Sequence, residues 1–133
     1  MTRAEIEALY KRSILPESKD PFHFEKKEGL EEILAYNPVC GDKYKIFLDG
    51  TDLYFHGIGC AISQASTSIV IRKISGLSRR EAKDYCSRFL KALETGDPSG
   101  FEDEELKTLI ELRNFEGRKD CIKLSWEAIE NNF

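Results

Sequence analysis

The sequence lacks the features that mark membrane, secreted and nucleic-acid-binding proteins. None of its apolar runs approaches the length of a membrane span, which needs about 18 residues. No membrane contact is therefore expected. Basic side chains number 20 against 24 acidic ones, a deficit that argues against binding to nucleic acid or anionic membranes. The first residues are charged and include no apolar core, so we expect no signal peptide and a cytoplasmic location.

Local cysteine pairs are also missing, although the chain has four cysteines. The C-x-x-C spacing that makes a zinc site convincing in a sequence does not occur. In a reducing compartment, isolated cysteines are metal ligands, reactive thiols or small buried side chains rather than disulfides. Each of the four must therefore be judged by its surroundings.

Hydrophobic periodicity predicts a single α+β domain over residues 1–133, with a small antiparallel β-sheet packed against several helices. Pro16 should end the first helix. The dipeptide Asp49-Gly50 is typical of a hairpin turn between two strands. The apolar pattern near residues 30–34 is too brief to assign. The expected elements of this half are a helix at 3–14 and strands at 44–48 and 53–55.

The second half is predicted to be helical. A capping box at Ser78-Arg79-Arg80-Glu81 begins one helix, and Gly96 ends it. The acidic run from Glu102 to Glu105 opens another helix, where the dipole favours negative charge, and we expect a solvated face there. The helices are expected at 61–74, from the capping box to Gly96, at 102–113, and from about 120 onward.

Three of the cysteines lie in short blocks suited to holding a thiolate. Cys40 is followed by Gly41, which permits a sharp turn, and the carboxylate of Asp42 can then reach the same point. Cys60 and Cys121 are both expected near helix starts, where unpaired N–H groups lower the pKa of a thiol. Three sulfurs and one carboxylate would suit zinc or part of an iron–sulfur cluster. Spacing alone leaves open the alternative that these are small buried side chains.

The other polar candidates have simpler interpretations. Cys86 lies on the apolar stripe of its helix, and we expect it in the core. His23 and His56 are interpreted as surface residues, although His56 is close enough in sequence to Cys60 to be an extra ligand. No histidine lies in local register to activate a serine, so helix packing is the better account of Ser63, Ser66 and Ser68.

Taken together, three blocks of this sequence resemble the U-type iron–sulfur assembly proteins, the IscU, NifU and SufU group. The blocks are Asn37–Asp42, Phe55–Ser66 and Cys121–Trp126, in the order found in that family. The resemblance runs from about residue 36 to the end of the chain, and the combination is far more specific than any one block. It implies a SufE/IscU-like fold. It also implies a metal held by Cys40, Asp42, Cys60 and Cys121.

Within this family, the sequence is most similar to the zinc-binding SufU branch. Cys121 lies 61 positions after Cys60, and the predicted helix at 102–113 resembles an insertion of that branch. Arg118 matches an arginine implicated there in docking to the desulfurase. The Leu-Pro-Pro chaperone-recognition segment of IscU proteins is missing before Cys121, which argues against a dedicated Hsp70-type partner.

Three features depart from the family pattern. The hairpin at Asp49–Asp52 is short, and the segment Ser18–Phe24 stands where relatives carry a Tyr-Lys-Asn-Pro-Arg-like stretch. Asp120 occupies a position where scaffold-type relatives often have histidine. These departures concern partner contacts rather than the metal ligands.

The resemblance implies a zinc-bound sulfur acceptor of iron–sulfur cluster assembly. Its partners would be a cysteine desulfurase, which supplies its own pyridoxal phosphate, and downstream assembly or acceptor proteins. Cys40 is the expected acceptor, so the chain would act as a sulfurtransferase with the desulfurase. One alternative is a non-enzymatic scaffold on which a [2Fe–2S] cluster is assembled and transferred. A second is a structural zinc domain that binds a protein partner.

Overall fold

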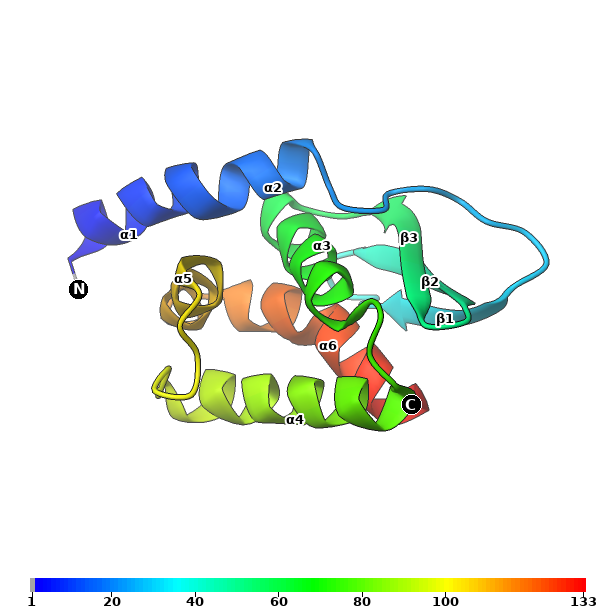
Figure 1. Ribbon diagram of the computed structural model, residues 1–133. Helices are drawn as coiled ribbons and strands as arrows, with labels where there is room; N and C mark the ends of the chain where they lie inside the picture. Colours follow the sequence, from blue (N-terminus) through cyan, green and yellow to red (C-terminus); the bar gives the residue numbers. More distant parts are fainter. Residues whose placement is uncertain (1) are drawn as a thin grey trace.

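The chain forms a three-stranded antiparallel meander with its helices gathered on one side, as Figure 1 shows. This computed structural model describes residues 2–133. The elements are α1 (Arg3–Leu9), the π-helical turn η1 (Tyr10–Ile14), α2 (Leu15–Lys19), β1 (Glu31–Tyr36), β2 (Lys43–Asp49), β3 (Asp52–Ile58), α3 (Ala61–Ile74), α4 (Arg79–Thr95), α5 (Glu104–Leu112) and α6 (Arg118–Asn132). The predicted α+β class with a small antiparallel sheet is confirmed. No helix within the described residues is long and apolar enough to cross a membrane.

The sheet is ordered β1-β2-β3, and its inner face packs on α3 and α6. Strand β1 is an element that the sequence did not allow us to assign. Its inward residues Ile33 and Ala35 are buried, but Leu34 and Tyr36 on the outer face are apolar too, with exposed fractions of 54% and 51%. Apolar residues on both faces hide the alternation that identifies a half-buried strand.

The N-terminal helix continues past Pro16, so the prediction that this proline ends it is wrong. The π-helical turn η1 lets the N–H of Leu15 donate to the carbonyl of Tyr10, five residues back. Pro16 then falls in the first turn of α2, a position that tolerates a residue without a backbone N–H. The helical segment therefore runs on to Lys19.

Buried hydroxyl groups join α3 to α6. The Ser66 hydroxyl donates to the carbonyl of Ile122 at 2.6 Å and accepts the indole N–H of Trp126 at 2.9 Å. The hydroxyls of Thr67 and Ser125 lie 2.6 Å apart. These contacts confirm the packing interpretation for Ser66, and they hold the helix that carries Cys121 against the helix that begins after Cys60.

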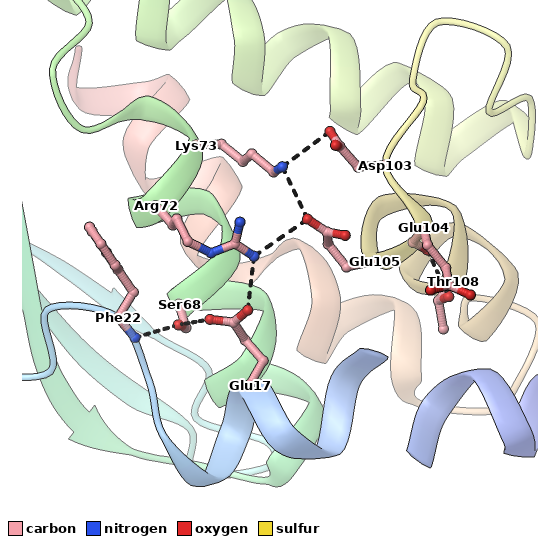
Figure 2. Close-up of polar contacts among 9 residues, drawn as sticks. All are labelled: Glu17, Phe22, Ser68, Arg72, Lys73, Asp103, Glu104, Glu105 and Thr108. Carbon is pink, nitrogen blue, oxygen red and sulfur yellow. Dashed lines mark hydrogen bonds and ion pairs between the residues drawn. The ribbon is translucent and has the colours of Figure 1, made fainter. Parts of the chain in front are cut away.

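Ion pairs connect α2, α3 and α5, as Figure 2 shows. Arg72 contacts Glu17 at 2.8 Å and Glu105 at 3.4 Å. Lys73 contacts Glu105 at 3.0 Å and Asp103 at 3.1 Å. The predicted solvated face at residues 102–105 is therefore wrong for Glu105, whose side chain is only 21% exposed, because the cations that bind it come from a distant helix.

We predict that Glu105→Gln makes stability less dependent on pH. Burial opposes ionisation of Glu105, but its own backbone N–H and the nearby Lys73 and Arg72 outweigh burial and lower its pKa below the ordinary 4.5. A lowered folded-state pKa stabilises the fold above pH 4.5, and this contribution is lost as the pH falls through the folded value. Urea unfolding at pH 7 should show a loss of ~1–2 kcal/mol for the variant.

At about pH 3.5, below the ordinary pKa of a glutamate, the difference in free energy of unfolding between the two proteins should be smaller than at pH 7. Glu102→Gln, at an exposed position outside the ion pairs found among residues 2–133, is the control and should match the wild type at both values. An equal loss for Glu105→Gln at both pH values would contradict the electrostatic role of this carboxylate.

Candidate metal centre

A tight loop between β1 and β2 brings Cys40 and Asp42 to the same side of the chain. The N–H of Asn37 donates to the carbonyl of Asp42 at 2.9 Å, and the N–H of Gly41 donates back to the carbonyl of Asn37 at 2.8 Å. The side-chain oxygen of Asn37 also accepts the N–H of Val39 at 3.0 Å. Gly41 has φ +82°, a left-handed conformation that favours glycine.

The carboxylate of Asp42 links two of the cysteine blocks. Its side chain is buried, with an exposed fraction of 3%. Oδ2 accepts the thiol proton of Cys40 at 3.1 Å, and Oδ1 accepts the backbone N–H of Cys60 at 3.0 Å. The loop before β2 and the turn after β3 are therefore joined through one side chain.

The structure brings three of the four predicted ligands into one group. The ligand atoms of Cys40, Asp42 and Cys121 all lie within 4.8 Å of one another. The sulfur of Cys60 lies outside this group, because it caps α3 by accepting the N–H of Ser63 at 3.4 Å. Cys60 nevertheless borders the group, since its thiol interacts with that of Cys121 and its N–H binds Asp42.

The close approach of these elements depends on Gly59. A Cβ at this position would lie 2.3 Å from the hydroxyl of Tyr44, 2.4 Å from the hydroxyl of Ser63 and 2.7 Å from Oδ1 of Asp42. These separations are far below van der Waals contact, so a larger residue would force the turn away from the strand. Glycine before Cys60 is thus a condition for the geometry of the group.

The electrostatics of the group favour a cation. Burial first, and then the acidic groups of Cys60, Asp42 and Cys40, raise the pKa of Cys121 to about 12. The N–H of Asp42 favours the thiolate of Cys40, but desolvation and the Asp42 carboxylate together outweigh it and raise the pKa of Cys40. The expected lowering of the Cys121 pKa by the helix start is therefore wrong, because burial and the neighbouring acidic groups oppose it more strongly.

The donor set fits a thiophilic metal ion. Two thiols and a carboxylate lie together with a third thiol beside them, which are the ligand types of zinc sites. Ligand atoms in a tetrahedral zinc site are about 3–4 Å apart, so small side-chain movements would close the group. Cys121 is buried whereas Cys40 is exposed, so an incoming reagent can reach Cys40 from solvent.

The remaining candidates lie outside this group. Cys86 is fully buried in α4, which confirms its predicted place in the core, and burial raises its pKa to about 12. His56 is exposed and stacks on Phe24 with ring centroids 4.8 Å apart. The Nδ1 atom of His23 lies 2.8 Å from the carbonyl oxygen of Leu53. Arg118 is exposed at the first position of α6.

Sequence reasoning missed Tyr44, a fully buried residue of β2. Its hydroxyl lies 2.8 Å from that of Ser63, close to the turn that carries Cys60. Burial, with a further contribution from the negative charge of Asp42, raises the pKa of Tyr44 far above its ordinary value. The available signal was a tyrosine at an inward position of a strand, two residues after a proposed ligand.

Comparison with known proteins identifies the family. Residues 9–97 match the model of the NifU-like N terminal domain, which is more than half of the chain. The chain therefore belongs to the NifU-like N terminal domain family.

Individual relatives cover nearly the whole sequence. The iron-sulfur cluster assembly scaffold protein IscU of Streptococcus pyogenes serotype M1 is 29% identical, over 98% of this chain and 86% of the relative. The zinc-dependent sulfurtransferase SufU of Bacillus subtilis strain 168 is 29% identical, over 96% and 90%. A candidate assembly scaffold for the SUF system from Fervidobacterium islandicum AW-1 superimposes with a TM-score of 0.70 at 29% identity, over 94% of this chain and 96% of that structure.

Proposed function

We propose that this protein accepts persulfide sulfur during iron–sulfur cluster assembly, with zinc held by Cys40, Asp42, Cys60 and Cys121. The observation that carries the proposal is the compact group of Cys40, Asp42 and Cys121, with an exposed thiol at its edge. The relatives named as a zinc-dependent sulfurtransferase and as an assembly scaffold support the same process.

The residues of the group would have different roles in this reaction. Zinc would keep the cysteines as thiolates and let one of them leave by ligand exchange, with no redox change. The raised thiol pKa values of Cys40 and Cys121 support the proposal that a cation keeps these cysteines ionised. Cys40 is the exposed thiol, so it is the one that can meet a sulfur donor on another protein.

The transfer step is a thiol exchange. The Cys40 thiolate attacks the outer sulfur of a persulfide on the cysteine of a pyridoxal-phosphate-dependent desulfurase. The S–S bond of the donor breaks, and its electron pair leaves on the sulfur of the donor cysteine. Cys40 then carries the persulfide, and no external oxidant or reductant is consumed. Downstream assembly or acceptor proteins would receive this sulfur.

The proposal is tested by metal analysis together with a desulfurase assay. Protein purified without chelators should contain about one zinc ion per chain, as the proposed four-ligand site requires. Adding it to a cysteine desulfurase should increase turnover, and mass spectrometry should detect a persulfide on Cys40. Absence of both zinc and stimulation would overturn the proposal.

Assembly of a [2Fe–2S] cluster on the same residues is the second candidate function. It is favoured by the relative named as a scaffold and by the similarity to the Fervidobacterium structure. Cysteine ligands also hold such clusters. An air-sensitive visible chromophore after reconstitution with iron and sulfide, without stimulation of a desulfurase, would support this function. Inertness in both assays, with zinc bound, would indicate a structural zinc domain.

We further predict that Arg118 contributes to desulfurase binding. Its side chain is exposed, lies three residues before Cys121 on the same helix, and forms no ion pair within the described residues. Arg118→Ala should weaken desulfurase binding about tenfold, a loss of ~1.4 kcal/mol typical of an interfacial arginine, while zinc content stays unchanged. Isothermal titration would measure the affinity. Arg80→Ala, an exposed arginine on α4, is the control, and equal affinities for both variants would exclude docking at Arg118.

A further inference from the structure

A buried hydrogen-bonded chain runs from β2 to the turn that carries Cys60. The hydroxyl oxygens of Tyr44 and Ser63 lie 2.8 Å apart, and the Ser63 hydroxyl donates to the carbonyl of Cys60 at 3.1 Å. A serine hydroxyl has a single proton. Ser63 can therefore donate to Cys60 while it accepts from Tyr44, and the three residues form one hydrogen-bonded chain.

The hydroxyl of Tyr44 is not needed to fill space in the sheet. The other inward residues of β2, Ile46 and Leu48, are aliphatic and buried. The ring of Tyr44 packs edge-on against Phe55, with centroids 5.9 Å apart, and an apolar ring could make the same contact. A buried hydroxyl is unfavourable unless it is paired, and the partner found here leads directly to a residue of the metal centre.

The hydrogen-bonded chain ends at Cys60, where it can orient the metal ligands. The peptide unit of Cys60 is held at both ends, since its carbonyl accepts from Ser63 and its N–H donates to Oδ1 of Asp42. The N–H thereby occupies one carboxylate oxygen and leaves Oδ2 facing Cys40. The Tyr44 hydroxyl also lies against the backbone of Gly59, beside Oδ1 of Asp42.

We propose that Tyr44 is a positioning residue of the metal centre. Its hydroxyl holds Ser63, and through it the Cys60 peptide, so that Asp42 presents a single oxygen to the metal. Groups that orient metal ligands in this way typically contribute 10–100-fold to metal affinity. The inference rests on the proposed metal site alone and is independent of whether sulfur is transferred there.

The test compares Zn²⁺ affinity with the stability of the metal-free protein. Tyr44→Phe keeps the ring and removes the hydroxyl, and chelator competition should show Zn²⁺ affinity lowered about tenfold. Tyr85→Phe is the matched control, because Tyr85 is a half-buried tyrosine of α4 that stacks on Trp126, away from the group. Its Zn²⁺ affinity should equal that of the wild type.

Two further measurements separate positioning from packing. Co²⁺ substituted for zinc should show altered visible absorption bands in Tyr44→Phe, because the bands report ligand geometry. Ser63→Ala should lower Zn²⁺ affinity by a similar factor. The variant that combines Tyr44→Phe with Ser63→Ala should lose less binding free energy than the sum of the two single losses, since both residues act through the same hydrogen bonds.

Three outcomes are decisive. Lowered affinity with altered Co²⁺ bands supports the proposal. Wild-type affinity and bands in Tyr44→Phe, with only urea stability reduced, would show that the tyrosine merely packs and would leave the proposed function intact. Failure of the wild-type protein to bind Zn²⁺ would overturn both the positioning role and the metal site.

Discussion

Cys40→Ala is expected to return the turnover of the desulfurase to the rate of that enzyme alone. Cys40 is the exposed cysteine of the group, and its thiol contacts Asp42 at 3.1 Å. Removing it deletes both the proposed nucleophile and one proposed ligand, so zinc content should also fall. The measurement is sulfide or alanine production by the desulfurase with and without the variant, together with zinc content.

A second variant separates the two roles of this residue. Cys40→Asp replaces the thiol by a carboxylate, which can still bind zinc but cannot carry a persulfide. It should retain most of the zinc and still fail to stimulate the desulfurase. Stimulation of the desulfurase by either variant would show that another cysteine is the sulfur acceptor.

Cys86→Ala is the matched control for these variants. This cysteine is also free but lies in the core of α4, with none of its surface exposed. The substitution leaves a small cavity, so unfolding should require ~1 kcal/mol less. Zinc content and desulfurase stimulation should stay at wild-type levels, and loss of metal would refute the assignment of Cys86 to the core.

Local sequence signals predicted most of the elements correctly. Helix α4 begins after the capping box at Ser78 and ends at Gly96, as expected. The turn after Asp49 joins β2 to β3. These signals work because a helix end or a tight turn is decided by a few adjacent residues. The fold was therefore largely readable from patterns within short windows.

Two of the errors involve contacts between distant segments. The ion pairs of Glu105 come from Arg72 and Lys73, which belong to α3. The raised pKa of Cys121 comes first from its burial and then from groups brought in by the loop at Asp42 and the turn at Cys60. No local pattern contains these interactions, since they exist only after the chain has folded.

The candidate site was predictable as a set of residues but not as an arrangement. Cys40, Asp42 and Cys121 lie together, whereas the sulfur of Cys60 is turned toward the N–H of Ser63. The contribution of Tyr44 could not be read from its neighbours in the sequence, because its partner Ser63 belongs to another element. The role of the glycine before Cys60 is steric and likewise depends on contacts with other elements.

Gly59→Ala is expected to abolish metal binding through this steric role. A methyl group at residue 59 would lie 2.3 Å from the hydroxyl of Tyr44 and 2.7 Å from Oδ1 of Asp42. Neither group can easily move, because Tyr44 is bound to Ser63 and Asp42 is bound to the N–H of Cys60. The turn must shift instead, which would carry Cys60 and Asp42 out of place.

The expected result is a protein that folds but holds little zinc. Overpacking of this kind should lower the free energy of unfolding by ~1–3 kcal/mol, and zinc content after purification should fall to background. Gly100→Ala is the control, since a methyl group there meets nothing within 4 Å. Adding Tyr44→Phe to Gly59→Ala removes the closest clash and should recover part of the lost stability without restoring zinc, because Asp42 still meets the methyl group. Full zinc content in Gly59→Ala would contradict the close approach of the Cys60 turn to Asp42, on which the geometry of the metal centre depends.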